Sequence, residues 1–278
     1  MRILAWGLVW LFGSTCQAAQ PEAYAFGVTN QRNLQAIAAY WNPILRYVSA
    51  RSGVPLELRV GRTASETTER VVSGEMDFAY TNHLFTPARA QLGWRVLARQ
   101  DTPGIQGQIV VPAHSPITSL ADLSGRVVAF SNPYSPVGHY VPMDTLLRAG
   151  VRVFPVFFGN PEAAMGYLMA GQVTAAGVNN RLMADFAQRT GLKYRVLSES
   201  KTYPDLAVMA SPRIAATLCE KVRQAFVGMA ADPEGARVLQ QAADSAGQSR
   251  MRGFVAANDA DYADYKAFFS RTVVPLNE

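Results

Sequence analysis

The stretch from Arg126 to Gly150 contains residues whose types and spacing suit the binding of an anion. The apolar run 127–130 predicts a buried strand, and after a break Ser135 and Pro136 are typical of the cap and the first position of a helix. A helix that begins directly after a strand points unpaired backbone N–H groups at whatever lies beyond the strand's carboxyl end. The alternative is an ordinary strand–helix unit that binds nothing.

Two other kinds of chemistry find less support in these residues. Ser135 and His139 are spaced like a nucleophile and a base, but both fall on the first turn of one helix, and no motif supplies a third residue that orients the base. His83, His114 and His139 lack the spacing of metal ligands. We therefore expect neither an enzyme nor a metal or other cofactor.

The composition is that of a soluble globular protein with one or two domains. The chain has 278 residues, of which 49% are hydrophobic and 17% charged, and its formal net charge is +5. The basic residues are not concentrated in a run, so the charge does not have the pattern of a nucleic-acid-binding surface. We do not expect a nucleic acid as a partner.

Residues 1–19 have the layout of a secretory signal peptide. Arg2 provides a positive charge, residues 3–12 form an apolar run too short to span a bilayer, and small residues lead to a cleavage site near Ala19. This layout predicts export of the mature chain to the periplasm. Cys16 raises the alternative of a lipid anchor, which is less favoured because the residues before it lack the usual leucine and a small Ala or Gly beside the cysteine.

Strand-like and helix-like segments alternate along the rest of the chain, which predicts an α/β protein. Two similar halves joined by two strand-like crossings suggest two lobes with a ligand cleft between them. We assign residues 20–103 and 204–278 to lobe one and residues 104–203 to lobe two, with hinges near 104 and 203. Short connections through helices predict parallel pairing in the first half. The expected strands are 24–28, 56–60, 78–81, 94–98, 108–111, 127–130, 151–158, 173–178, 194–197 and 206–210, and the expected helices include 34–52, 63–72, 136–149, 161–170, 181–191, 214–230, 233–243 and 259–272.

Three segments resemble a known family. Residues 71–80, VVSGEMDFAY, resemble the approach to a strand in the first lobe of type II periplasmic binding proteins, and residues 119–130, SLADLSGRVVAF, resemble the entry to their second lobe. A more specific match is the pattern N-P-x-S-x-x-G-x-x-x-P at residues 132–142. It is similar to the phosphate, phosphite and phosphonate receptors of ABC importers. The resemblance covers essentially the whole chain after the predicted signal peptide.

This resemblance implies a fold and a function. Each lobe would be a mixed, mainly parallel sheet flanked by helices, and the cleft would bind a small anion such as a phosphonate, phosphite or phosphate. The protein would be a monomeric periplasmic solute-binding protein that partners an ABC permease in the inner membrane. Because receptors of this branch also serve membrane histidine kinases, the alternative is a ligand-sensing receptor with a sensor kinase as its partner.

The sequence departs from the branch at two places that bear on the ligand. The branch typically has S-T-S-G at the helix start, where this chain has Ser135-Pro136-Val137-Gly138, so that two hydroxyls and one N–H are missing. Pro161 stands where the branch tends to have a histidine. Because a hydrogen bond to a charged group contributes about 1.5–3 kcal/mol, we expect weaker binding of phosphate and simple phosphonates, or a different small polar ligand. His139 and Tyr140 would compensate in part.

The candidate ligand-binding residues lie at the ends of the expected strands and around the capped helix. For most of them a structural role remains open: Tyr80 as a buried ring, Asn30 and Ser135 as helix caps, His139 as a satisfied histidine, and Tyr203 as a hinge or lid residue. The full set is Asn30, Tyr80, Thr81, Asn82, Ser135, Val137, Gly138, His139, Asn179, Asn180 and Tyr203.

Overall fold

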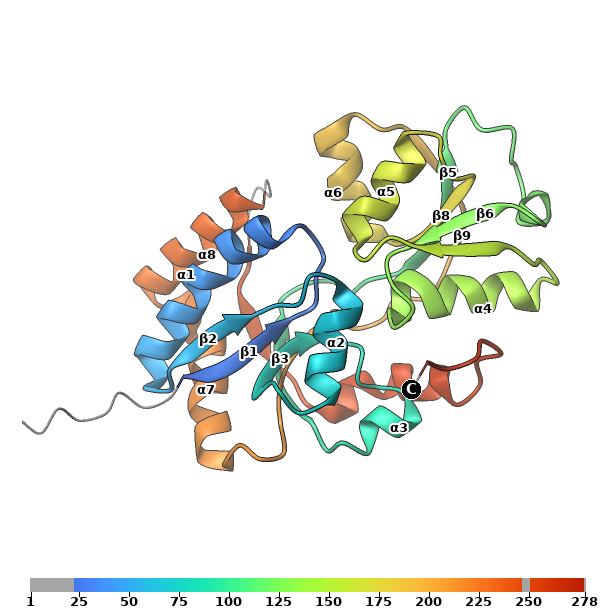
Figure 1. Cartoon of the computed structure of the whole chain (residues 1–278). Coiled ribbons are helices and arrows are strands. Elements are labelled where there is room, and N and C mark those ends of the chain that lie inside the picture. The colour runs from blue at the N-terminus through green and yellow to red at the C-terminus, as the bar shows by residue number, and fades with distance from the viewer. Residues whose placement is uncertain (1–22, 247–250, 278) are drawn as a thin grey trace, which may run out of the picture.

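The computed structural model describes residues 23–246 and 251–277. It has two lobes, each built on its own sheet with helices packed around it (Figure 1). The expected two-lobed α/β fold is therefore confirmed. The predicted signal peptide, its cleavage site and Cys16 lie outside the described residues.

Lobe one contains a six-stranded sheet in the order β11-β4-β10-β3-β1-β2. β1 pairs with β2 and β3 in parallel, whereas β10 pairs with β3 and β4 in antiparallel fashion, and β11 also runs antiparallel to β4. The expectation of parallel pairing is therefore wrong for β4, because β10, which returns from the other lobe, is inserted between β3 and β4. The strands are β1 (Tyr24–Val28), β2 (Leu56–Arg59), β3 (Phe78–Thr81), β4 (Arg95–Gln100), β10 (Ala207–Ala210) and β11 (Phe254–Ala256).

The helices α1 (Leu34–Ser52), α7 (Ala216–Gly228) and α8 (Pro233–Ser245) pack together on lobe one. α1 begins where the Asn33 side chain accepts a hydrogen bond from the Ala36 N–H, and it ends at Gly53, whose φ of 68° is left-handed. Its apolar residues, spaced three or four apart, place Trp41 beside Phe26 and Tyr80 in the core. The remaining helices of this lobe are α2 (Ala64–Val72), α3 (Pro87–Ala90) and the short turn η3 (Met229–Ala231).

Lobe two contains a five-stranded sheet in the order β7-β6-β8-β5-β9. β6 pairs in parallel with β7 and β8, and β5 pairs in antiparallel fashion with β8 and β9, so this sheet is also mixed. The strands are β5 (Gly107–Pro112), β6 (Val127–Phe130), β7 (Phe154–Phe157), β8 (Ala175–Asn179) and β9 (Tyr194–Glu199). The helices are η1 (Ala121–Leu123), η2 (Pro136–Tyr140), α4 (Val141–Arg148), α5 (Pro161–Met169) and α6 (Asn180–Thr190).

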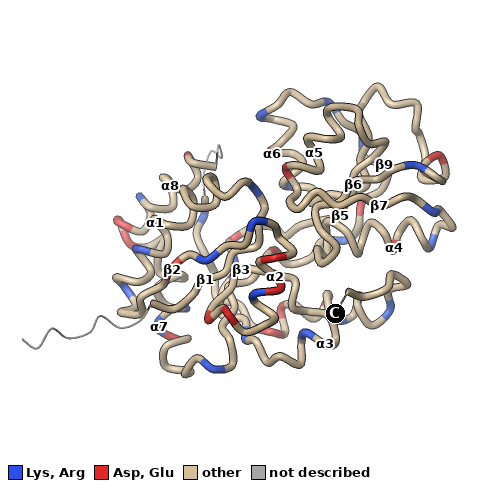
Figure 2. The backbone as a smooth tube through the Cα atoms, viewed as in Figure 1, with Lys and Arg blue, Asp and Glu red and all other residues tan. Residues whose placement is uncertain are grey.

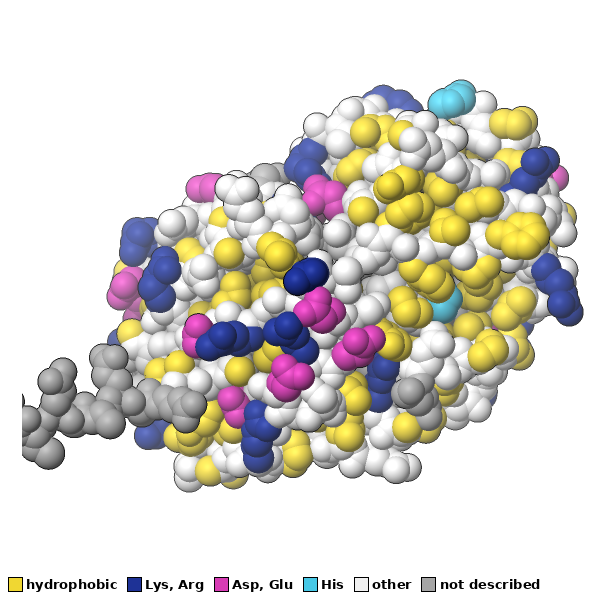
Figure 3. Space-filling view, in the orientation of Figure 1, with side chains coloured by type: hydrophobic (Ala, Val, Ile, Leu, Met, Phe, Trp, Pro, Cys, Tyr) yellow, Lys and Arg dark blue, Asp and Glu magenta, His cyan; other side chains and the backbone are white. Residues whose placement is uncertain are grey.

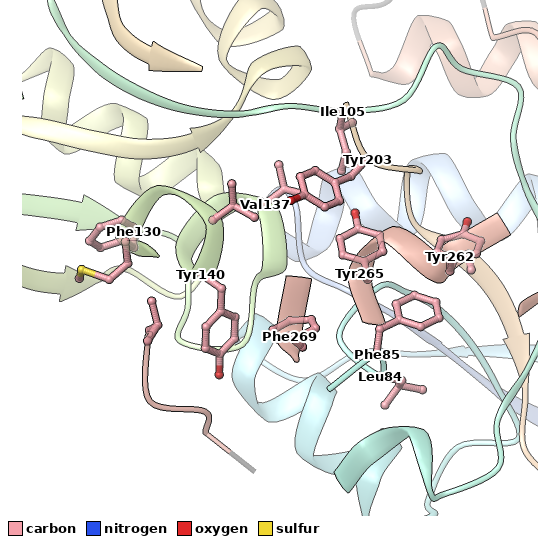
Figure 4. Close-up of a cluster of buried hydrophobic side chains, with 14 of the residues drawn as sticks. Leu84, Phe85, Ile105, Phe130, Val137, Tyr140, Tyr203, Tyr262, Tyr265 and Phe269 are labelled. Atoms are coloured by element: carbon pink, nitrogen blue, oxygen red, sulfur yellow. The ribbon is translucent and has the colours of Figure 1, made fainter. Parts of the chain in front are cut away.

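The two crossings between the lobes are joined to each other. The backbones of Ile105 and Tyr203 exchange two hydrogen bonds of 2.8 Å and form an isolated bridge. A stack of aromatic rings supports this bridge, with the Tyr203 and Tyr265 centroids 5.1 Å apart and those of Phe85 and Tyr265 5.4 Å apart (Figure 4). The apolar core is therefore continuous through the two crossings.

The C-terminal segment packs against both lobes. It consists of η4 (Asp259–Tyr262), α9 (Ala263–Phe269) and the residues that follow. The Thr272 hydroxyl and the Val273 N–H both donate to one carboxylate oxygen of Asp144 at 2.9 Å, and the Asn277 N–H donates to the Tyr140 hydroxyl at 2.9 Å. This segment of the chain therefore reaches across to α4 of lobe two.

Surface charge is spread over both lobes. In the part of the chain that the structure describes, positions with Lys or Arg are scattered among those with Asp or Glu and form no continuous basic stripe (Figure 2). Hydrophobic side chains gather on the visible face of lobe two (Figure 3). The large exposed hydrophobic residues of this lobe include Phe154, Phe157 and Tyr167. Within residues 23–246 and 251–277, no helix combines the length and apolar character needed to cross a membrane.

Replacing Gly177 by alanine should destabilise lobe two. A Cβ atom on Gly177 would lie 2.5 Å from Cδ1 of Phe130, which is fully buried beneath β8. Because overpacking a core typically costs about 1–3 kcal/mol, we expect the free energy of unfolding in urea to fall by that amount. Gly166 of α5 is the matched control, since a Cβ there meets no atom within 4 Å. Gly166→Ala should leave stability unchanged or raise it by up to about 1 kcal/mol. Equal stability of the two variants would contradict the proposed packing.

Candidate ligand site between the lobes

Two adjoining pockets lie in the cleft and share Thr29, Gln31, Asn179 and Leu182. One pocket surrounds the start of η2 and takes its polar side chains from both lobes; we call it the cradle. We call the second the aromatic chamber, because its lining includes three rings of lobe one. The main polar residues of the cradle are Asn30, Asn82, His83, Ser131, Asn132 and Ser135. The chamber contains Arg32, Tyr40, Trp41, Tyr80, Arg181 and Asp205.

The helix start in the cradle differs from the expected regular helix. The Ser135 hydroxyl accepts the Gly138 N–H at 3.1 Å, as a cap should, but the next turn is π-helical, with the Tyr140 N–H donating to the Ser135 carbonyl at 3.0 Å. Pro142 accounts for this. Pro142 has no N–H, and in an α-helix its ring would clash with the carbonyl four residues earlier. A wider turn relieves that clash. The α-helix therefore starts at Val141 instead of Pro136.

The lobe-two wall of the cradle presents neutral donors. The Val137 N–H has no acceptor among the described residues, and it belongs to the N-terminal turn, where the helix dipole favours negative charge. A Cβ on Gly138 would lie 2.8 Å from the Ser135 hydroxyl oxygen and 3.2 Å from that of Ser131. The two hydroxyls thus converge beside Gly138, where a larger side chain would displace the Ser135 hydroxyl.

The lobe-one wall carries amides and a histidine. Asn82 donates to the Tyr265 hydroxyl at 3.1 Å, which fixes its side chain at the floor of the cleft. Asn30 lines the cradle, but its amide donates to the Gly61 carbonyl at 2.9 Å and accepts from the Thr67 hydroxyl at 2.7 Å. Its side chain therefore holds the loop before α2. His83 is buried, and this burial, with a smaller contribution from the Arg89 guanidinium, lowers its pKa to about 3.

Asn179 lies at the junction of the two pockets. Its side-chain oxygen accepts the N–H groups of Arg181 and Leu182, at 2.9 and 3.3 Å, and so caps α6. The same residue lines both the cradle and the chamber. Because the amide oxygen is used by the cap, only the amide nitrogen is left to donate to a ligand.

The aromatic chamber combines rings with an ion pair. Tyr80 packs on Trp41 with ring centroids 4.7 Å apart, and its hydroxyl has no hydrogen-bond partner among the described residues. Burial raises the pKa of Tyr80 well above its ordinary value, so the hydroxyl remains a donor. Arg181 of lobe two forms an ion pair with Asp205, which follows the second crossing. The chamber thus contains an electrostatic contact between the lobes.

Of the residues expected from the sequence, seven line these pockets and four do not. Asn30, Asn82, Ser135, Val137 and Gly138 lie in the cradle, Tyr80 lies in the chamber, and Asn179 lies in both. Thr81, His139, Asn180 and Tyr203 are absent from both linings.

Each of these four has a structural contact instead. The Thr81 hydroxyl accepts the His83 N–H at 3.0 Å, and the Asn180 side-chain oxygen accepts the Gln106 N–H at 2.9 Å. His139 donates from Nδ1 to the Pro133 carbonyl at 3.0 Å and packs against the Phe130 and Phe157 rings, and burial lowers its pKa to about 4. Tyr203 belongs to the second crossing between the lobes, where burial raises its pKa to about 12.

Sequence analysis missed several residues that line the pockets. Ser131 directly follows β6 and could have been recognised from that position, because strand ends border the cleft. The histidine His83 was considered only as a metal ligand. No local sequence pattern indicates Arg181 and Asp205, because their ion pair joins distant segments. Within the described ranges, no group of three His, Cys, Asp or Glu side chains could hold a metal ion.

Comparison with known proteins gives one family. The family model described as ABC transporter, phosphonate, periplasmic substrate-binding protein matches residues 26–262, which is most of the chain.

Solved structures with a similar fold include transport receptors of two chemical classes. A binding protein component of an ABC phosphonate transporter from Pseudomonas aeruginosa has a TM-score of 0.74 at 16% identity, covering 89% of this chain and 86% of its own. A protein from Prochlorococcus marinus in complex with methylphosphonate gives the same TM-score and identity, with coverages of 89% and 97%. An alkanesulfonate-binding protein from Xanthomonas axonopodis, bound to MOPS, has a TM-score of 0.63 at 16% identity, with coverages of 91% and 94%. At these identities the likeness concerns the fold alone.

Proposed function

This chain belongs to the family of phosphonate ABC transporter periplasmic substrate-binding proteins, and from that premise we propose that its cradle binds a small phosphorus oxyanion for import. The family consists of solute-binding proteins and not of enzymes. Membership implies a periplasmic location, a small ligand and a permease in the inner membrane as partner. We further propose that residues 1–19 are cleaved on export and that the mature protein is a monomer.

The observation that carries this proposal is the convergence of neutral donors at the start of η2. The Ser131 and Ser135 hydroxyls flank the bare Cα of Gly138, and the Val137 N–H beside them is not used by the fold. Groups of this kind at a helix N-terminus bind anions without a counter-charge. The lining of the cradle contains no charged side chain among the described residues, so this helix terminus would supply the attraction.

Ser131 replaces one of the hydrogen-bond donors whose loss leads us to expect weak binding of a phosphorus oxyanion. Pro136 and Val137 remove two hydroxyls and one N–H from the stretch that this branch uses, and Pro161, which lines the cradle, has no donor. The Ser131 hydroxyl supplies one donor from the preceding strand end. We therefore propose that a phosphorus oxyanion binds, with lower affinity than is usual for the branch.

Contacts across the cleft support a closing motion coupled to this binding. The Ala64 N–H of α2 donates to the Gly159 carbonyl of lobe two at 3.0 Å, and the Tyr134 hydroxyl donates to Glu69 at 3.2 Å. We propose that a ligand in the cradle adds contacts to both lobes and so favours this closed arrangement. No feature of the described residues favours the alternative of a sensory receptor, and import remains our proposal.

The proposal can be tested by titrating the purified chain from residue 20 onward with methylphosphonate, phosphite, phosphate and small carboxylates in a calorimeter. We expect a phosphorus oxyanion to bind and Ser131→Ala and Ser135→Ala each to weaken it about tenfold or more, because each removes a hydrogen bond to a charged group. Ser270→Ala, which alters an exposed serine of the C-terminal segment, is the control. Binding that persists undiminished in both cradle variants would mean that the site lies elsewhere.

A further inference from the structure

His83 differs from the other polar residues of the cradle because its hydrogen bonds determine which ring nitrogen carries the proton. The Thr68 hydroxyl donates its only hydrogen to the Ala64 carbonyl at 2.8 Å. Its oxygen lies 2.7 Å from His83 Nδ1 and can only accept there. The tautomer that satisfies both contacts at once has the proton on Nδ1 and a lone pair on Nε2 of the neutral ring.

Nothing in the surroundings of His83 favours a second proton. The side chain is 2% exposed, and burial is the main reason why its pKa falls to about 3. The charged group acting on it is Arg89 of α3, which donates to the His83 carbonyl at 3.1 Å and also disfavours imidazolium. α2 contributes the uncharged Thr68, and the described lining of the cradle has no acid or base other than His83. At periplasmic pH, Nε2 thus remains an acceptor.

Nε2 has no hydrogen-bond partner among the described residues, while His83 lines the cradle. We propose that His83 Nε2 accepts a hydrogen bond from a protonated oxygen of the bound anion, so that the cradle selects singly protonated phosphorus oxyanions over sulfates and sulfonates. This inference rests on the proposed function, since it requires an oxyanion in the cradle. It goes further by assigning the ligand a protonation state and by assigning His83 a role in specificity.

The selectivity follows from the acid–base chemistry of the two anion classes. The second ionisation of a phosphoryl group lies near neutral pH, at about pH 6 for a phosphate monoester, so one oxygen still carries a proton in mildly acidic solution. A sulfonate or sulfate is fully deprotonated there and would place an oxygen lone pair against that of Nε2. The tetrahedral shape is the same in both cases, so only the proton distinguishes them.

The test compares methylphosphonate with methanesulfonate by calorimetry at pH 6 and pH 8.5. At pH 6 we expect methylphosphonate to bind at least about tenfold more tightly, the factor that corresponds to one hydrogen bond to a charged group. At pH 8.5 the methylphosphonate affinity should fall by a similar factor as its second proton is lost. The affinity for methanesulfonate should not change with pH.

Two variants and a control separate His83 from the rest of the site. His83→Gln should reduce the preference for methylphosphonate and flatten its pH dependence. Thr68→Val removes the group that accepts the Nδ1–H, so that Nε2 can carry the proton instead. Because Thr68 does not line the cradle, this variant should reduce the preference for methylphosphonate without altering the lining itself. His114→Gln changes an exposed histidine and should behave like the wild type.

The outcomes distinguish this inference from the proposed function. Equal affinities for the two anions at pH 6, or a preference unaltered in both variants, would overturn the role of His83 while leaving anion binding intact. Failure of every tetrahedral anion to bind the wild-type protein would overturn the proposed function, and this inference with it.

Discussion

Gly138→Ala is expected to lower the affinity for methylphosphonate by about 100-fold or more. The new methyl group would lie 2.8 Å from the Ser135 hydroxyl oxygen and 3.2 Å from that of Ser131, next to the place that we assign to the anion. It would exclude the ligand and displace both hydroxyls. Because each hydrogen bond to a charged group contributes about 1.5–3 kcal/mol, losing two accounts for about 100-fold or more. Calorimetric titration of the wild type and the variant measures the difference.

A loss of binding in this variant should not reflect misfolding. Gly138 is not among the glycines with positive φ, so an alanine meets no backbone strain there. Gly228→Ala is the matched control, because a Cβ in that part of α7 meets nothing within 4 Å. Both variants should unfold cooperatively, and the control should bind as the wild type does. Full affinity in Gly138→Ala would show that no ligand occupies the space beside the two serines.

Local sequence signals predicted most elements of this fold, because each signal acts through neighbouring residues. The expected strand 78–81 coincides with β3, and the expected helix 34–52 coincides with α1, whose ends are marked by Asn33 and Gly53. The pairing of β4 could not be obtained in this way. Its partner β10 lies about a hundred residues further on, and the pattern of a strand does not specify which strand will lie beside it.

The direction of side chains explains part of what the sequence missed in the site. Tyr80, Thr81 and Asn82 were all expected in the cleft, but successive side chains of a strand point to opposite faces. Tyr80 packs on Trp41 and lines the chamber, whereas the Thr81 hydroxyl turns to the backbone of its own turn. Because of this alternation, Tyr80 and Thr81 should not have been expected to line the same site. The π-helical turn was likewise foreseeable from Pro142, which the sequence places one turn inside the helix.

Other parts of the site depend on contacts between distant segments. The tautomer that we infer for His83, in the turn after β3, depends on the contacts of Thr68 in α2, and no pattern around residue 83 indicates it. The same holds for the ion pair of Arg181 and Asp205, which lie 24 positions apart and come together only when the second crossing forms. The residues on which we base specificity and closure are thus brought together by tertiary contacts, whereas the helix cap at Ser135 is local.

Breaking that ion pair should shift the protein toward the open arrangement. Asp205 is 4% exposed, and besides Arg181 its side chain accepts from the Leu206 N–H at 2.8 Å and the Thr102 hydroxyl at 3.4 Å. Arg181→Ala would leave a buried carboxylate without its cation. Removing one partner of a buried pair costs about 3–5 kcal/mol, and because the Arg181 side chain is 34% exposed we expect about 1–3 kcal/mol here.

This cost falls on the closed arrangement, because Arg181 lies on α6 of lobe two and Asp205 follows the second crossing. The apparent affinity falls with the fraction of closed protein, so Arg181→Ala should weaken methylphosphonate binding about 10-fold to 100-fold. Small-angle scattering of the unliganded variant should show a larger radius of gyration than that of the wild type. Arg189→Ala is the control: its side chain is also 34% exposed, but it pairs with Glu162 inside lobe two.

A second change separates closure from direct contact with the ligand. Replacing Asp205 by asparagine in the Arg181→Ala background removes the unpaired charge, so it should restore part of the compaction and part of the affinity. If Arg181 instead acted by binding the ligand in the chamber, Arg181→Ala would lose affinity at an unchanged radius of gyration, and the asparagine would restore nothing. That result would leave the anion site in the cradle intact and remove the ion pair from the closing mechanism.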